Sequence, residues 1–343
     1  MSLAWSPMEF TITTVNPLDH AEAIKRLFVT HGRAEFPGFF DRAYEVAVRA
    51  GGVSWVGRDR AGQLMMHVAC FPRRFRFGTR DVVGGLLMNA LVAEPYRSFF
   101  PARELMRRAR DDIKARGDVD FLYTDPNEPA RAVLEASGFR HIGTLQRLVL
   151  PVGDRRWLVD GVIRLLHVRA RGPRRGRSVP DAIARRAAEH SAVAFETPSG
   201  NSPRLRPHYG TALYAARLEG YPAPNDTWFT FFQNGVGSAP TAGLLVRGPD
   251  QSGHAMLHAV RRAPDLPLGQ VIPGLVRALR AAGCARLQIV TLAHSDFAAE
   301  LRHAGFVARQ DSAPLLAAPL TATGDAVLGA VPQWEITDLD CDR

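Results

Sequence analysis

The chain has 343 residues, of which 46% are hydrophobic and 22% are charged, close to the usage of ordinary globular proteins. This composition excludes a disordered chain, a collagen-like repeat and a small disulfide-stapled scaffold. The length allows roughly two domains of about 150 residues each. No apolar run reaches the roughly 18 residues of a membrane-spanning helix, so we expect no membrane partner.

The net charge is +9, and it is carried almost wholly by arginine. Of 43 basic residues, only Lys25 and Lys114 are lysine. Arginine binds phosphate through a planar fork, so an anionic small molecule is the expected partner; no nucleic-acid-binding motif accompanies the charge. The three cysteines (Cys70, Cys284 and Cys341) are too widely spaced for a disulfide framework or a cysteine metal site. Together with an N-terminus that lacks a signal-peptide pattern, they predict a cytoplasmic protein.

The first half alternates strand and helix signals. Apolar periodicity and turn residues predict strands at 10–15, 53–57, 63–71, 81–92, 119–124 and 141–151, and helices at 18–31, 39–49, 101–116 and 128–137. Pro101 at the opening and Gly117 at the end mark the third helix. Because that helix joins two strands, it predicts a parallel crossover in a mixed sheet.

The second half repeats the later part of the first. Expected strands lie at 227–232, 242–247, 254–260 and 286–291, and expected helices at 268–282 and 296–304. Two helix ends read alike, Ala-Val-Leu-Glu-Ala-Ser-Gly-Phe at 132–139 and Ala-Glu-Leu-Arg-His-Ala-Gly-Phe at 299–306. This similarity predicts a diverged duplication at the scale of a domain.

The predicted organisation is therefore a domain at 1–152, a basic linker at 153–204 and a second domain at 205–343. The arginine-rich run at 169–186 is interpreted as a solvated linker or exposed helix. The acidic C-terminal stretch that begins at Trp334 is expected either to fold back over the cleft between the halves, with Trp334 as its anchor, or to form a loose tail.

One region of the first half carries a motif. Residues 87–97 read Leu-Met-Asn-Ala-Leu-Val-Ala-Glu-Pro-Tyr-Arg, and after a helix and a strand come Pro126-Asn127 and then Gly138-Phe139. This pattern resembles the GNAT superfamily of N-acetyltransferases, well over residues 8–152 and weakly over 205–320. Both halves together look like the tandem-GNAT proteins of bacteria. The resemblance implies an α/β fold with two tandem domains, each a central mixed sheet flanked by helices.

The resemblance also implies an acyl-CoA site in the first half. Its pyrophosphate would meet the turn before the third helix, and its pantetheine arm would lie along a splayed strand. The implied contacts are Leu91, Val92, Arg97, Ser98, Phe99, Phe100, Ala102 and Asn127. The chain departs from the family at Ser98 and Phe100, where glycine is usual, and Pro101 supplies no N–H.

The implied catalytic residues also depart from the family pattern. Where a Tyr general acid is common, this chain has Leu134, and its counterpart in the second half is Leu301. The remaining candidates are Tyr123, Asn89 and Asn127. Each has a plain structural alternative, since a strand tyrosine packs in the core and an Asn before a helix caps it.

Other polar residues near the inferred cleft have structural interpretations as well. His67, in Met-Met-His-Val-Ala-Cys, is expected to be a satisfied strand histidine, and Cys70 a small buried hydrophobe. Glu94 and Asp125 complete the set of candidate polar groups. No metal-binding motif is present in the sequence, and none is expected.

Three functions remain open. The first is transfer of an acetyl group from acetyl-CoA to a small amine such as an amino sugar. The second is a GNAT-fold protein without catalysis that binds a ligand or a partner. The third is aminoacyl transfer from charged tRNA, as in the Fem-type transferases that share the double-domain plan. The oligomeric state and the acyl chain length stay open.

Overall fold

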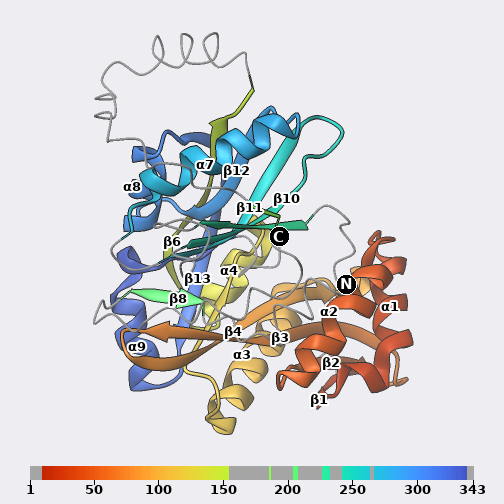
Figure 1. Cartoon of the computed structure of the whole chain (residues 1–343). Coiled ribbons are helices and arrows are strands. Elements are labelled where there is room, and N and C mark those ends of the chain that lie inside the picture. Colours follow the sequence, from red (N-terminus) through yellow and green to blue (C-terminus); the bar gives the residue numbers. More distant parts are fainter. Residues whose placement is uncertain are drawn as a thin grey trace.

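The computed structural model describes residues 10–153, 204–207, 242–262 and 266–337, and the backbone of 185–186 and 226–231. In this part of the chain thirteen strands form one sheet, with helices against its faces (Figure 1). The prediction of a mixed α/β fold is confirmed. The expected linker run at 169–186 lies outside the described residues except for its last two, which form a short strand.

The first half follows the predicted order of elements. It contains β1 (Phe10–Val15), α1 (Ala21–Thr30), α2 (Phe36–Arg49), β2 (Val53–Asp59), β3 (Leu64–Phe77), β4 (Arg80–Val92), α3 (Phe99–Arg116), β5 (Phe121–Thr124), α4 (Glu128–Ala136) and β6 (Arg140–Pro151). Short 3₁₀ turns at Pro17–His20 and Glu94–Tyr96 precede α1 and α3.

The second half adds a shorter series of elements. It contains β7 (Arg185–Arg186), β8 (Leu205–Pro207), β9 (Asp226–Phe231), β10 (Ala242–Arg247), β11 (His254–Arg262), α7 (Leu268–Ala281), β12 (Arg286–Leu292), α8 (Asp296–His303), β13 (Val307–Pro319) and α9 (Ala322–Gly329). A 3₁₀ turn at Val331–Gln333 leads to the buried Trp334.

The strand order shows that the two halves exchange strands. It runs β1-β2-β3-β4-β5-β13-β6-β12-β11-β10-β9-β7, with β8 paired to β3. Thus β13, from the blue end of the chain in Figure 1, lies between β5 and β6, and β6 lies between β13 and β12. On either side of β13 and β6 lies one parallel pair of strands. This pair is β4 with β5 in the first half and β11 with β12 in the second half. The two halves therefore have the same topology. Strand β13 of the second half pairs with β5 of the first, and β6 of the first half pairs with β12 of the second.

The helices cover opposite faces of the first half of the sheet. On one face, Tyr44 of α2 packs edge-on against Phe71 of β3, with ring centroids 5.0 Å apart. On the other face, Asp112 of α3 accepts a 2.9 Å hydrogen bond from the indole nitrogen of Trp55. Trp55 is aligned with Val68 of β3, so these two side chains point to the same face of the sheet. Phe71 lies three residues after Val68, and side chains alternate along a strand, so Phe71 points to the opposite face.

Several predicted boundaries are wrong, and four strands or helices were missed. The helix expected to open at Pro101 begins at Phe99, because Ser98 is its N-cap. The helix expected at 18–31 is a 3₁₀ turn followed by α1. The missed elements are β7, β8, β13 and α9. The polar run at 309–312 interrupts the apolar alternation of β13, and its side chains are exposed.

Candidate functional site

The strands β4 and β5 separate after a short stretch of pairing. Residues Gly84–Leu86 of β4 pair in parallel with Phe121–Tyr123 of β5. Beyond Leu86, β4 continues to Val92 along β3, but no described strand pairs with it on the β5 side. Strand backbone that lacks a partner keeps strong hydrogen-bonding groups available. This opening can therefore accept an extended ligand that carries amide groups.

A β-bulge bends β4 at the opening. His67 of β3 is aligned with Leu91, whereas Ala69 is aligned with Met88, so β4 has one extra residue in this interval. Asn89 in the bulge has a φ of 52°, the only positive φ among the described residues other than glycine. Asn is one of the few side chains that tolerate this conformation, and bulges redirect the strands that contain them.

A buried hydrogen-bond network holds the bulge. Nδ1 of His67 lies 2.9 Å from the carbonyl oxygen of Asn89, and its Nε2 lies 3.1 Å from Oγ of Ser54. Because a carbonyl only accepts, Nδ1 carries the proton and Nε2 accepts from the serine hydroxyl. On the other side, Nδ2 of Asn89 donates to the hydroxyl of Tyr44 at 3.1 Å.

Burial makes the network electrically neutral. It lowers the pKa of His67 to about 4, against an ordinary value of 6.5, because the charged ring would lose its hydration. Burial also raises the pKa of Tyr44 far above its ordinary value. His67 is thus a satisfied strand histidine, as predicted. No local pattern in the sequence indicates that His67 bonds to Ser54 of β2, or that Asn89 bonds to Tyr44 of α2.

The N-terminus of α3 follows the end of β4. Ser98 is the N-cap, and its side chain makes no capping hydrogen bond. Phe99 is 50% exposed and Phe100 is 64% exposed. Arg97 is exposed and forms no ion pair with a described residue. The first amides of a helix point outward and favour anions, so this turn offers polar groups to a phosphate.

The other predicted contacts lie on the elements around the opening. Leu91 and Val92 are half-buried at the end of β4, and Ala102 is half-buried in the first turn of α3. Asn127 is exposed and accepts a 3.1 Å hydrogen bond from the backbone N–H of Ala130, which makes it the N-cap of α4. The side-chain carbonyl oxygen of Asn127 therefore caps a helix, which is the structural role that the sequence offered as an alternative to catalysis.

Tyr123 lies where β4 and β5 begin to diverge. It is aligned with Leu86, the last β4 residue that pairs with β5. Its side chain is 1% exposed and packs against Phe75 and Phe121, with ring centroids 5.9 and 5.7 Å away. Asn89 and Tyr123 therefore stand on the two strands that border the opening. Their catalytic roles stay predictions.

Cys70 is the small buried residue that the sequence predicts, and Cys284 and Trp334 are buried as well. Cys70 is buried, and burial raises the pKa of its thiol to about 12, so it is an inert thiol at neutral pH. Cys70 and Cys284 are both unpaired. Trp334 is buried, and its Nε1 donates to the carbonyl of Val327 at 3.1 Å, so it anchors the chain that follows α9.

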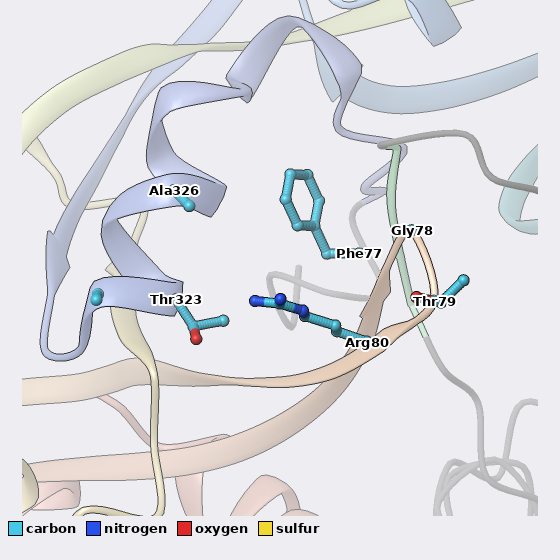
Figure 2. A pocket seen from close by; sticks show the side chains of 7 residues that line it. Phe77, Gly78, Thr79, Arg80, Thr323 and Ala326 are labelled. Atoms are coloured by element: carbon cyan, nitrogen blue, oxygen red, sulfur yellow. The ribbon is translucent and has the colours of Figure 1, made fainter.

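A separate pocket lies away from this opening. It has a volume of about 410 Å³ and is bordered by the β3–β4 turn and by α9. Figure 2 shows Phe77 and Arg80 extending from the turn toward Thr323 and Ala326 of α9. None of the predicted donor-binding or catalytic residues lines it. Within the described ranges, no cluster of three His, Cys, Asp or Glu side chains could hold a metal, and no helix could span a membrane.

The comparisons with known proteins address the fold. No protein-family model and no curated protein matches the chain. Two solved GCN5-related N-acetyltransferases are similar, from Kribbella flavida (12% identity, TM-score 0.61, 90% of this chain and 71% of that chain) and from Anabaena variabilis (11%, 0.61, 92% and 74%).

A third solved structure has the same fold. It is a GCN5-related glucosamine N-acetyltransferase region of a fungal multi-domain beta-N-acetylglucosaminidase (14% identity, TM-score 0.55, 91% of this chain and 38% of that chain). These matches extend over nine tenths of the chain. The chain therefore has the fold of the GNAT N-acetyltransferases, as the motif at 87–139 predicted.

Proposed function

We propose that this chain is an acyl-CoA-dependent N-acyltransferase that moves an acetyl group from acetyl-CoA to a small amine. The observation that carries the proposal is the opening between β4 and β5, where strand backbone with no partner among the described strands adjoins the N-terminus of α3. The solved structures of the same fold are described as N-acetyltransferases, which supports the reaction class. Two unpaired, buried cysteines fit the proposed cytoplasmic setting.

The donor would lie along β4 with its phosphates at α3. The amide groups of its pantetheine arm would pair with the backbone of β4 beyond Leu86, much as an added strand does, beside Leu91 and Val92. The pyrophosphate would accept hydrogen bonds from the helix amides. Its proposed contacts are the N–H groups of Phe99, Phe100 and Ala102, the hydroxyl of Ser98 and the guanidinium of Arg97.

The chemistry would be direct attack on the thioester. The amine nitrogen forms a bond to the carbonyl carbon, the carbon–sulfur bond breaks, and one proton leaves the nitrogen while the thiolate gains one. A backbone N–H at the Asn89 bulge would polarise the carbonyl. Tyr123 would protonate the thiolate, which its position beside the diverging strands supports. Asn127 would use its free amide NH₂ to orient the substrate.

An amino sugar is the proposed acceptor. The fungal region that shares the fold is described as a glucosamine N-acetyltransferase, and this supports an amino-sugar acceptor here. A test would measure thiol release from acetyl-CoA with glucosamine, and with an amino acid and a polyamine for comparison. Release with glucosamine alone supports the acceptor class, whereas release only with another amine contradicts it.

A specific observation favours a second candidate, a GNAT-fold protein that binds acyl-CoA without catalysis. The amide nitrogen of Asn89 is bonded to Tyr44 and the carbonyl oxygen of Asn127 caps α4, so both candidate catalytic asparagines have structural bonds. Binding of acetyl-CoA with no thiol release across the amine panel would favour this candidate.

Isothermal titration with acetyl-CoA tests the donor site itself. Arg97→Ala removes one charge-assisted contact, worth about 1.5 kcal/mol, and should weaken binding about tenfold. The matched control is Arg80→Ala, which removes the same charge from the opposite end of β4 and should leave binding unchanged. Equal effects of the two variants, or no binding by the unmodified chain at millimolar acetyl-CoA, would contradict the proposal.

A further inference from the structure

The second half has its own opening between two parallel strands. Residues His254–Met256 of β11 pair with Arg286–Gln288 of β12, and the two strands then diverge as β4 and β5 do. A register shift leaves one extra residue, His258, in β11 opposite β10, so the bulge of β4 is repeated as well. The backbone of the second half thus contains an opening of the same kind as the proposed donor opening between β4 and β5.

The chain itself fills this second opening. Thr337 forms an antiparallel bridge with Thr291 of β12, and its hydroxyl donates to the carbonyl of His258 in β11 at 2.5 Å. The hydroxyl of Thr291 donates to the carbonyl of Ile336 at 2.7 Å. Residues 334–337, which we call the C-terminal segment, therefore bond to both diverging strands.

The C-terminal segment is held firmly. The side chains of Trp334, Ile336 and Thr337 are all buried. Trp334 packs against Phe121 of β5, with ring centroids 5.5 Å apart. Seated in this way, the segment excludes other ligands from the space between β11 and β12.

The carboxylate of Glu335, in the C-terminal segment, forms ion pairs with arginines near the end of β11. The Glu335 carboxylate lies 2.9 Å from Arg204, 2.9 Å from Arg206 and 3.8 Å from Arg262. Arg262 is the last residue of β11, and its side chain is 4% exposed. Glu300 of α8 also pairs with Arg204 and Arg262. A buried arginine needs such anions, because an unpaired charge is costly there.

The segment runs in the direction proposed for the donor in the first half. Its carboxylate at 335 lies by the end of β11, before the chain enters α7, and Thr337 lies deeper, beside His258. In the first half the phosphates would likewise lie by the end of β4 before α3, with the thioester deeper. Peptide groups thus stand where the pantetheine arm would pair, and a carboxylate stands where a phosphate would bind.

We infer that the C-terminal segment is an internal occupant of the second donor opening, and that each chain binds a single acyl-CoA, in the first half. The inference rests on the proposed function for the position of that first donor. It predicts unequal halves: the opening between β4 and β5, which no described strand fills, binds the donor, and the opening between β11 and β12 is closed by the chain.

The test counts acetyl-CoA molecules bound per chain by isothermal titration. The unmodified chain should bind one. A chain that ends at Glu335 keeps Trp334 and the arginine contacts but loses the peptide that bridges β11 and β12, and it should bind two. In that shortened chain, Arg97→Ala should weaken only one of the two binding events.

A second variant guards against a shortened chain that fails to fold. Thr337→Pro keeps the full length but removes the hydroxyl and N–H of residue 337, and it should also admit a second acetyl-CoA. Two molecules bound by the unmodified chain, or one bound by both folded variants, would overturn the inference and leave the proposed function standing. If no form of the chain binds acetyl-CoA, both proposals fall.

Discussion

At the scale of single residues, the bulge in β4 depends on Asn89. Its backbone has a φ of 52°, and its side chain bonds to the buried hydroxyl of Tyr44. An alanine in this conformation would be strained by about 1 to 2 kcal/mol, whereas glycine adopts it freely. The bulge therefore combines a backbone requirement with a side-chain hydrogen bond, and two substitutions can separate them.

We predict that Asn89→Ala is less stable than Asn89→Gly by about 1 kcal/mol, since both lose the bond to Tyr44 but only alanine is strained. Urea unfolding of both variants and the unmodified chain measures the difference. If alanine proves as stable as glycine, the left-handed conformation of residue 89 is not required.

His67 predicts a pH dependence of stability. Its pKa is about 4 in the folded chain and 6.5 in the unfolded chain, so the unfolded state binds the proton more readily. The contribution is fully present above pH 6.5 and is lost as pH falls toward 4, by about 3 kcal/mol in all. His67→Gln should flatten this part of a curve of unfolding free energy against pH. An unchanged slope between pH 6.5 and 4 would contradict a neutral, buried His67.

At the scale of elements, Asp120 joins the two halves near β5. Its carboxylate accepts hydrogen bonds from the backbone N–H of Val83 and the hydroxyl of Thr321, each at 2.9 Å. Its carbonyl accepts from the N–H of Leu320 at 2.8 Å. The approach is close, because a Cβ added at Gly324 would lie 1.9 Å from that carbonyl oxygen. The start of α9 is thus fixed against the start of β5.

Asp120→Ala should destabilise the chain by about 2 to 3 kcal/mol, because it leaves a backbone N–H of β4 without its charged acceptor. Asp120→Asn keeps one acceptor oxygen and should cost less than half of that. Chemical unfolding with the same two-state analysis compares the two. A loss under 0.5 kcal/mol for the alanine variant, of the size of an ordinary surface change, would contradict this role.

Local patterns predicted most elements but not their partners. The order of the first ten elements followed from apolar periodicity, Pro101 and Gly117, since these signals lie within each element. The partners of His67 are 13 and 22 residues away in the sequence, and no local pattern indicates them. The helix start at Phe99 was missed because two exposed phenylalanines do not form an amphipathic pattern with the turns that follow.

At the scale of the whole molecule, the strand exchange links the two halves. The strand β13 is aligned with both β5 and β6, so neither of these strands has its full set of partners within residues 1–152. The duplication was visible in the repeated helix ends, whereas the exchange depends on pairing between residues more than 150 positions apart. The division at 152 and 205 stays a prediction.

The fragment 1–152 should not form a stable monomer, because it would expose edges on β5 and β6. Circular dichroism and size-exclusion chromatography of the fragment, and of the fragment mixed with 153–343, check this. We expect cooperative unfolding only in the mixture. A monomeric fragment with its own sharp transition would show that β13 is dispensable.

The central claim is that the opening between β4 and β5 holds an acyl donor. A crystal structure of the full chain with CoA tests it most directly. We predict pyrophosphate density at the N-terminus of α3, near Arg97 and Ser98, a pantetheine arm along β4 beyond Leu86, and the C-terminal segment still in place between β11 and β12. CoA bound between β11 and β12, or bound away from β4, would contradict the account.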